Sequence, residues 1–139
     1  MSQFWAYRPG DPYESFKVDF IDAVNEADAR DRMQRFLVLR RGVRRAGVPF
    51  LGPLCLRGVV RACRELGNAA RTLRHARRLV IDDPSAPNFQ ELGEAEHACG
   101  NSEAARGAFL LAARLAEQTG NTEEIEAALC AIAALPGVG

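Results

Sequence analysis

Hydrophobic positions in the first third of the chain recur every three or four residues. Between residues 16 and 46 the positions that follow this interval include Phe16, Phe20, Val24, Met33, Phe36, Leu37 and Val43. This interval matches the 3.6-residue turn of an α-helix. Asn25 and Asp28 lie between the two groups, and both residue types commonly begin helices. The pattern predicts a short helix from about residue 16 and a longer helix that ends near residue 46.

A stretch rich in glycine and proline then interrupts the period, at Gly47, Pro49, Gly52 and Pro53. Proline lacks the amide hydrogen that a helix interior needs, so we expect a loop here. The helical period returns over residues 54–66, 69–81, 86–99, 102–118 and 122–135. Asn121, with Glu124 three residues later, forms a capping box at the start of the last segment. Strand-like alternation of useful length does not occur, so the sequence predicts an all-α fold.

Two Gly-Asn pairs point to an internal repeat. Gly67-Asn68 and Gly100-Asn101 lie 33 residues apart, and each falls between two expected helices. The hairpin around the second pair carries large and small residues at regular places: Phe89, Leu92, Gly93, Gly100, Ala105, Phe109 and Ala112. The hairpin around the first pair is less regular and carries Leu56, Val59, Val60, Cys63, Gly67, Thr72, Ala76, Asp83 and Pro84. A period of this length is typical of stacked helical hairpins.

Residues 53–118 therefore resemble two tetratricopeptide repeats. In that pattern glycine and alanine let the two helices of a hairpin approach closely, while large residues fill the space between hairpins. The later unit departs from the pattern at Glu96, where an aromatic residue is usual, and at Glu117, where proline is usual. The earlier unit lacks the Leu-Gly pair and both aromatic residues.

The resemblance implies a short helical-hairpin solenoid with a concave groove that binds peptides or protein surfaces. Members of the family act mostly as assembly factors, co-chaperones and scaffolds. The helices of residues 16–46 would then cover one end of the solenoid. A capping helix over residues 121–135 would cover the other end, because an exposed repeat needs a polar outer face.

The first fifteen residues have a different character. They hold Phe4, Trp5, Tyr7 and Tyr13, together with Pro9, Gly10 and Pro12, and show no helical period. We expect an aromatic arm over residues 1–15, followed by a single helical domain over residues 16–139. The aromatic side chains either pack on the protein's own helices or, in the case of Phe4 and Trp5, enter pockets on a partner.

The net charge of zero conceals three blocks of opposite sign. Residues 1–34 hold seven acidic and four basic side chains, residues 35–78 hold twelve arginines and one glutamate, and residues 79–139 hold ten acidic side chains and two arginines. The general preference for arginine over lysine fits a GC-rich bacterial genome, but a codon bias does not cluster arginine in one block. The blocks therefore carry information about partners.

Three arginines of the basic block share one stripe of the first repeat helix. Arg57, Arg61 and Arg64 are spaced by four and three residues. The family resemblance makes this the groove-facing stripe. Guanidinium groups match carboxylate and phosphate in geometry, so the stripe favours an acidic protein segment as the partner. The alternative is a solvated face that the acidic C-terminal block partly neutralises.

A second hypothesis concerns the next helix. Residues 62–79 also resemble a DNA-binding helix-turn-helix, with Arg71, Arg74, His75 and Arg78 placed to contact phosphates and bases. Two positions disagree, because Asn68 and Arg77 stand where that motif usually has apolar residues. The sequence favours the repeat and keeps nucleic-acid binding as the alternative.

Other features give little support to catalysis. The four cysteines are widely spaced without a C-x-x-C pair, and His97 and Cys99 are two residues apart, on different sides of a helix. Recognisable metal, phosphate-loop and nucleophile motifs are missing. We expect a cytoplasmic protein that is not an enzyme, with no metal, no cofactor and no membrane span, and with its cysteines acting as small buried hydrophobic residues.

Overall fold

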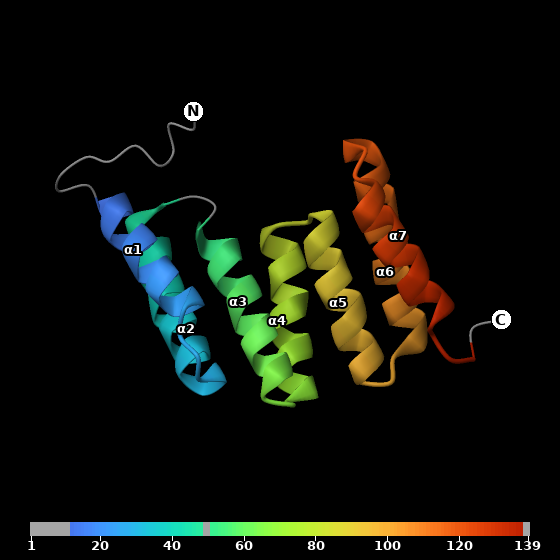
Figure 1. Cartoon of the computed structure of the whole chain (residues 1–139), viewed down its shortest axis with the longest axis horizontal. Helices are drawn as coiled ribbons and strands as arrows, with labels where there is room; N and C mark the ends of the chain where they lie inside the picture. Colours follow the sequence, from blue (N-terminus) through green and yellow to red (C-terminus); the bar gives the residue numbers. More distant parts are fainter. Residues whose placement is uncertain (1–11, 49–50, 138–139) are drawn as a thin grey trace.

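The computed structural model describes residues 12–48 and 51–137. These residues form seven helices (Figure 1) and no strand. The helices are α1 (Pro12–Val24), α2 (Ala29–Ala46), α3 (Leu51–Glu65), α4 (Ala69–Asp82), α5 (Ala86–Ala98), α6 (Ser102–Thr119) and α7 (Thr122–Ala133). The all-α prediction is confirmed, and the seven helices match the segments with a helical period, apart from the starts of α1 and α3.

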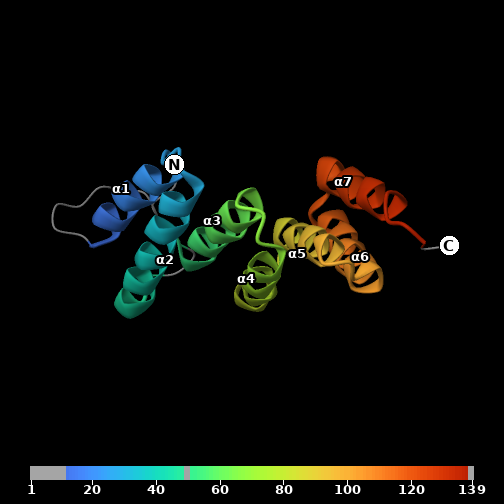
Figure 2. The same cartoon turned by 90° about the horizontal axis from the view of Figure 1, so that it is seen from below.

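The helices are arranged in two layers. Figure 2 shows α1, α3, α5 and α7 in one layer and α2, α4 and α6 in the other. Each helix packs on its neighbours in the chain, and α5 also touches α3 and α7 within its own layer. The result is a solenoid of three hairpins closed by α7, because a chain of antiparallel helices that each bury one apolar stripe stacks in this way.

The repeated Gly-Asn pairs have a local structural cause. Gly67 and Gly100 adopt φ angles of 75° and 80°, in the left-handed region that ends a helix and that glycine adopts without steric cost. Asn68 then begins α4, because its side-chain oxygen accepts a hydrogen bond from the amide of Arg71 at 3.1 Å. Asn121 caps α7 in the same way through the backbone amide of Glu124, which is the Asn121 half of the predicted capping box.

Two glycines bring helices into close contact. A Cβ atom added at Gly93 would lie 2.4 Å from Cε1 of Phe109, and one added at Gly58 would lie 2.5 Å from Cε2 of Phe36. The first contact joins the two helices of the α5–α6 hairpin, as the tetratricopeptide pattern predicts. The second joins α3 to α2 of the preceding hairpin. Most of the buried side chains lie around this second contact, on α2, α3 and α4.

Glu96 replaces the expected aromatic residue with a polar contact. Its side chain is buried, and its carboxylate accepts hydrogen bonds from Arg77 of α4 at 3.2 Å and from the side-chain amide of Asn101 at 2.8 Å. A buried carboxylate is tolerated when charged and polar donors surround it. The departure from the family pattern therefore keeps α4 and α5 together by an ion pair in place of a ring.

Two boundaries from the sequence are wrong. The expected arm of residues 1–15 ends earlier, because α1 begins at Pro12. The expected loop also ends earlier, because α3 begins at Leu51 and takes in Pro53. Both prolines lie in a first helical turn, where the amide has no partner within the helix and the missing hydrogen costs little. Phe4 and Trp5 lie outside the described residues.

Candidate functional site

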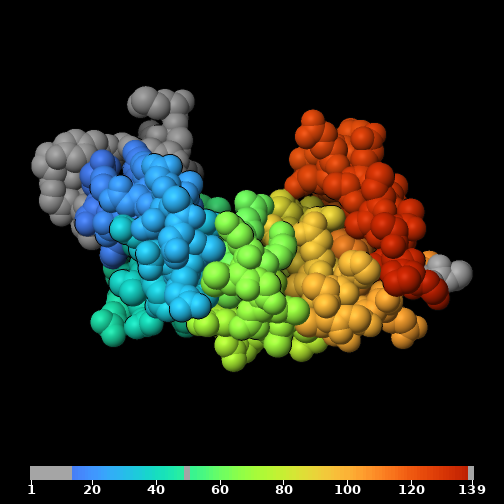
Figure 3. All heavy atoms as spheres, turned by 60° about the horizontal axis from the view of Figure 1, so that its bottom comes forward, coloured from blue at the N-terminus to red at the C-terminus, as the bar shows by residue number. Residues whose placement is uncertain are grey.

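The layer of α1, α3, α5 and α7 forms the concave face. Figure 3 shows the surface hollowed between the blue N-terminal helices and the red α7. A cavity of about 230 Å³ lies near α1 and is lined by Phe20, Val24, Arg32, Phe36, Leu54, Arg57, Gly58 and Arg61. A cavity of about 420 Å³ lies near α7 and is lined by Arg61, Arg64, Ala86, Pro87, Gln90, Glu91, Glu94, Glu124 and Ala127. Arg61 borders both, so we treat them together as the concave groove.

The structure brings Arg57, Arg61 and Arg64 together along the floor of this groove. Each one is held by a side chain of α5. Nε of Arg57 donates to Oδ1 of Asn88 at 2.8 Å, and Nε of Arg61 donates to Oε2 of Glu91 at 2.9 Å. Arg64 donates to the other oxygen of Glu91 and pairs with Glu94 at 3.2 Å. The stripe on α3 therefore faces a matching polar stripe on α5.

These partners are more buried than the arginines that they hold. Asn88 is fully buried, and its amide nitrogen donates to the carbonyl and the carboxylate of Asp83, both at 3.0 Å. The Glu91 side chain is 7% exposed, whereas those of Arg61 and Arg64 are 59% and 41% exposed. Side chains of α5 thus hold all three guanidinium groups, while the side chains of Arg61 and Arg64 stay exposed to solvent and that of Arg57 is half-buried. Part of their charge is neutralised by Glu91 and Glu94, which belong to the acidic block.

Burial also acts on the acidic wall of the groove. It raises the pKa of the Glu94 carboxyl, and the nearby Glu91 acts in the same direction, while Arg64 and Arg61 oppose the shift. Glu91 and Glu94 lie about one helical turn apart on α5, so their charges repel each other. The arginines of α3 offset this repulsion and keep the two carboxylates on one face.

The end of the groove near α1 is apolar. Phe20 and Phe36 pack with ring centroids 5.7 Å apart and tilted by 59°, and Leu54 and Val24 border the same cavity. In the sequence Phe20, Val24 and Phe36 follow the helical period, and no motif indicates that they line a groove. Their place there follows from the packing of α1 and α3 on α2, which no local pattern specifies.

The residues of the helix-turn-helix hypothesis lie in the other layer. Arg71, Arg74, His75 and Arg78 follow one side of α4, and Arg78 pairs with Asp82 at 3.0 Å. Burial lowers the pKa of His75, and so do the charges of Arg74, Arg71 and Arg40. The hypothesis is wrong about the fold, because α3 and α4 form one hairpin of a solenoid. Asn68 is a helix cap and Arg77 pairs with Glu96, which explains why neither position is apolar.

The four cysteines differ in burial, and Cys99 is only half-buried. Cys55 and Cys63 are buried as predicted, and burial raises the pKa of the Cys55 thiol to about 12 and also raises that of Cys63. Cys130 is exposed, which corrects the prediction, because no further described helix covers the outer side of α7. Among residues 12–48 and 51–137 there is no cluster of three or more histidine, cysteine or acidic side chains that could hold a metal.

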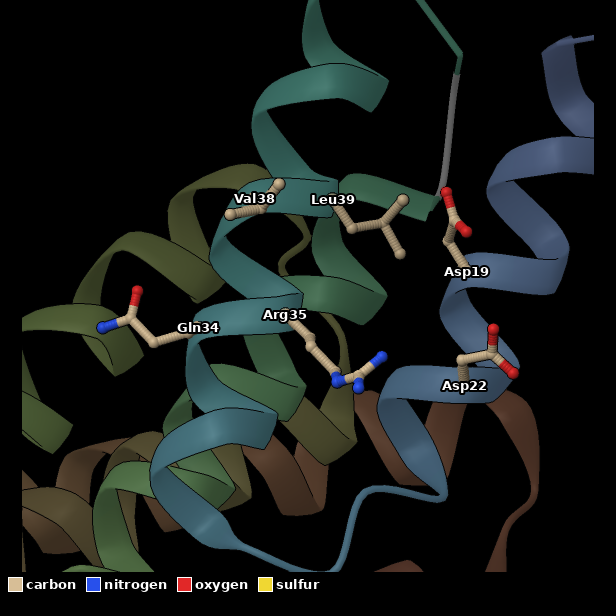
Figure 4. Close-up of a pocket in the computed structure, with 6 residues that line it drawn as sticks. All are labelled: Asp19, Asp22, Gln34, Arg35, Val38 and Leu39. Atoms are coloured by element: carbon tan, nitrogen blue, oxygen red, sulfur yellow. The ribbon is translucent and has the colours of Figure 1, made fainter.

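A separate cavity of about 320 Å³ lies between α1 and α2. Figure 4 shows Asp19 and Asp22 on its α1 side and Gln34, Arg35, Val38 and Leu39 on its α2 side. Arg35 also pairs with Glu26 at 3.3 Å. The cavity shares no lining residue with the concave groove, and no sequence motif indicated it.

Within the described part of the chain, no helix is long and apolar enough to cross a membrane. No protein-family model and no curated protein matches the sequence. The structure is similar to the crystal structure of PcrH from Pseudomonas aeruginosa, with a TM-score of 0.74 and 14% sequence identity, over 97% of this chain and 98% of that chain. The likeness covers α1 and α2 as well as the two hairpins recognised from sequence. At this identity it shows the fold alone, which is a tetratricopeptide-like helical-hairpin solenoid.

Proposed function

We propose that this protein is a non-catalytic adaptor or assembly subunit that binds an acidic segment of another protein in its concave groove. The observation that carries the proposal is the row of anchored guanidinium groups of Arg57, Arg61 and Arg64 along the groove, of which Arg57 is half-buried and Arg61 and Arg64 are exposed. Protein binding is also what the tetratricopeptide-like fold favours, because a superhelical stack presents an extended concave surface.

The contacts with α5 prepare the arginines for a ligand. Arg57 and Arg61 each use Nε to bind an acceptor on α5, and no further hydrogen bond from their terminal nitrogens to a described residue is present. A guanidinium that is already oriented loses less conformational freedom when a carboxylate binds to its free edge. Asn88 and Glu91 therefore act as the support for the binding residues.

The two ends of the groove add selectivity of different kinds. Near α1, the side chains of Phe20, Val24 and Leu54 offer a cavity for an apolar side chain, and buried apolar anchors commonly supply most of the affinity of a small interface. Near α7, Glu124 borders the groove beside Gln90 and Glu94, which disfavours further negative charge at that end. The preferred segment is therefore acidic in its middle and apolar toward α1.

Charge neutralisation tests this proposal. The groove variant carries Arg57→Gln, Arg61→Gln and Arg64→Gln, which keep most of each side chain and avoid placing a new carboxylate beside Glu91. The control variant carries Arg106→Gln and Arg114→Gln on the exposed side of α6. A partner is isolated from the native organism by co-purification and mass spectrometry, and its affinity is measured by isothermal titration calorimetry.

We expect the groove variant to bind the partner at least about tenfold more weakly, a loss of about 1.4 kcal/mol or more. The control variant should bind like the wild type, and both variants should keep the helical circular dichroism signal. Equal affinity of the groove variant and the wild type would refute an arginine-dependent groove.

A further inference from the structure

The outer layer of the solenoid carries unpaired positive charge. Helices α2 and α4 hold eleven arginines and two acidic residues, Asp31 and Asp82. Five of the arginines form ion pairs, which involve Arg32, Arg35, Arg40, Arg77 and Arg78. Among the described residues, the other six have no acidic partner; they are Arg30, Arg41, Arg44, Arg45, Arg71 and Arg74. Unlike the groove arginines, these face no row of glutamates.

Part of this charge converges between the two helices. Arg40 of α2 reaches Asp82 of α4 at 3.1 Å. At the other end, Arg30 and Gln34 of α2 share a cavity of about 350 Å³ with Asn68 and Arg71. Met33, Cys63 and Leu66 also line this cavity. Helical spacing places Arg71, Arg74, His75 and Arg78 on one side of α4, the side on which Arg71 borders the cavity shared with α2. We call this channel, from Arg30 and Arg71 to Arg40 and Arg78, the outer trough.

Three buried nitrogen atoms of the outer trough lack a hydrogen-bond partner in the part of the chain that the structure describes, although Asp82 pairs with Arg40 and Arg78 at one end. Nε of Arg40, Nε of Arg71 and Nε2 of His75 are buried and have no hydrogen-bond partner among the described residues. Buried polar atoms are normally paired, so three orphaned nitrogens in one region are unusual. Burial is the main cause that lowers the pKa of His75, and the charges of Arg74, Arg71 and Arg40 lower it further because they oppose its protonation.

The lining of the outer trough indicates the class of partner. Protein interfaces usually have an apolar centre from which charged residues are depleted, whereas nucleic-acid interfaces are polar and strongly positive. Arginine forks bind phosphate oxygens in pairs and at a defined angle. The residues that line the trough cavity include no aromatic side chain on which an unpaired base would stack. This combination favours the backbone of a duplex over a single strand or a protein segment.

We infer that the outer trough binds the phosphate backbone of a double-stranded nucleic acid, without reading its sequence. Arg30, Arg71 and Arg74 supply the guanidinium contacts, and the paired Arg40 and Arg78 border the site. The trough cavity and the concave groove share no lining residue, and the arginines of the trough belong to α2 and α4, in the layer opposite α3 and α5 (Figure 2). Binding at one site therefore does not require binding at the other.

The experiment measures fluorescence anisotropy of a labelled 20-base-pair DNA duplex of arbitrary sequence, a length chosen to exceed the ~21 Å span of fourteen helical residues. The trough variant carries Arg30→Gln, Arg71→Gln and Arg74→Gln. Two controls are the α6 variant with Arg106→Gln and Arg114→Gln and the groove variant with Arg57, Arg61 and Arg64 changed to Gln. Each is measured at about 50 and 200 mM salt.

We expect the wild type to bind with a dissociation constant in the micromolar range at the lower salt and to weaken steeply at the higher salt. About three phosphate contacts give a slope near −3 in the logarithm of the association constant against the logarithm of salt. The trough variant should lose at least tenfold in affinity and most of this slope, while both controls bind like the wild type. An unchanged groove variant separates this inference from the proposed function.

Three results would overturn the inference. In the first, folded wild-type protein does not bind the duplex at the lower salt. In the second, the trough variant and the α6 variant lose binding equally. In the third, polyglutamate at equal charge concentration displaces the duplex. The last result would assign the trough to an acidic protein. Sedimentation of the free protein at both salts checks that the anisotropy change does not come from self-association.

Discussion

Replacing Phe109 by alanine is expected to lower the free energy of unfolding by about 3–5 kcal/mol. The Phe109 side chain is 2% exposed and forms a small core cluster with Ala105 and Leu135. Little else fills this end of the solenoid, where many buried residues of α6 are alanines. The cavity left by the ring would therefore be difficult to close by rearrangement.

The measurement is urea unfolding followed by circular dichroism, with Leu110→Ala as the matched control. Leu110 is the next residue on the same helix and is 42% exposed, so its truncation should cost less than about 1 kcal/mol. A loss below about 1 kcal/mol for Phe109→Ala would show that the ring is not buried between α5 and α6.

The second large effect is expected at Gly93. Replacing it by alanine places a Cβ atom 2.4 Å from Cε1 and 2.5 Å from Cδ1 of Phe109, which is too close for any side-chain contact. We expect a destabilisation of about 1–3 kcal/mol from overpacking. Gly107→Ala on α6 is the control, because nothing lies within 4 Å of the added atom there. This control should be neutral or gain up to about 1 kcal/mol in helix propensity.

A double variant separates the contact from other effects of the substitution. In a Phe109→Ala background the new Cβ at position 93 has room, so Gly93→Ala should cost little or become stabilising. The difference between the two backgrounds is the coupling energy of the pair. An equal cost of Gly93→Ala in both backgrounds would contradict the close contact between α5 and α6.

The hairpin around Gly93 was predictable from sequence because its contact partner lies at the family's spacing. Gly93 and Phe109 belong to the same hairpin, and the tetratricopeptide pattern expects the aromatic residue on the second helix, after the glycine. The equivalent close contact of Gly58 is with Phe36, which precedes it and lies on another hairpin. A search within one repeat unit cannot find it, so the α1–α2 hairpin carried no repeat signature in the sequence.

The groove was predictable on one side only. Helical spacing placed Arg57, Arg61 and Arg64 on one stripe, but their partners lie about thirty residues later, on α5. Asn88, Glu91 and Glu94 are themselves spaced by three residues, and this stripe was a usable signal. The sequence does not show which residues of α3 lie opposite which residues of α5. That register depends on how α4, which connects the two helices in the chain, packs against both.

Photocrosslinking tests the central claim most directly, because it reports which face of the solenoid touches the partner. A benzoylphenylalanine is placed at Val24 near one end of the concave groove, at Ala127 near the other end, or at Leu111 on α6. Val24 and Leu111 are 53% and 43% exposed, and Ala127 is exposed. We expect crosslinks to the co-purified partner from positions 24 and 127 and none from position 111. Crosslinks from position 111, with none from positions 24 and 127, would contradict binding in the concave groove.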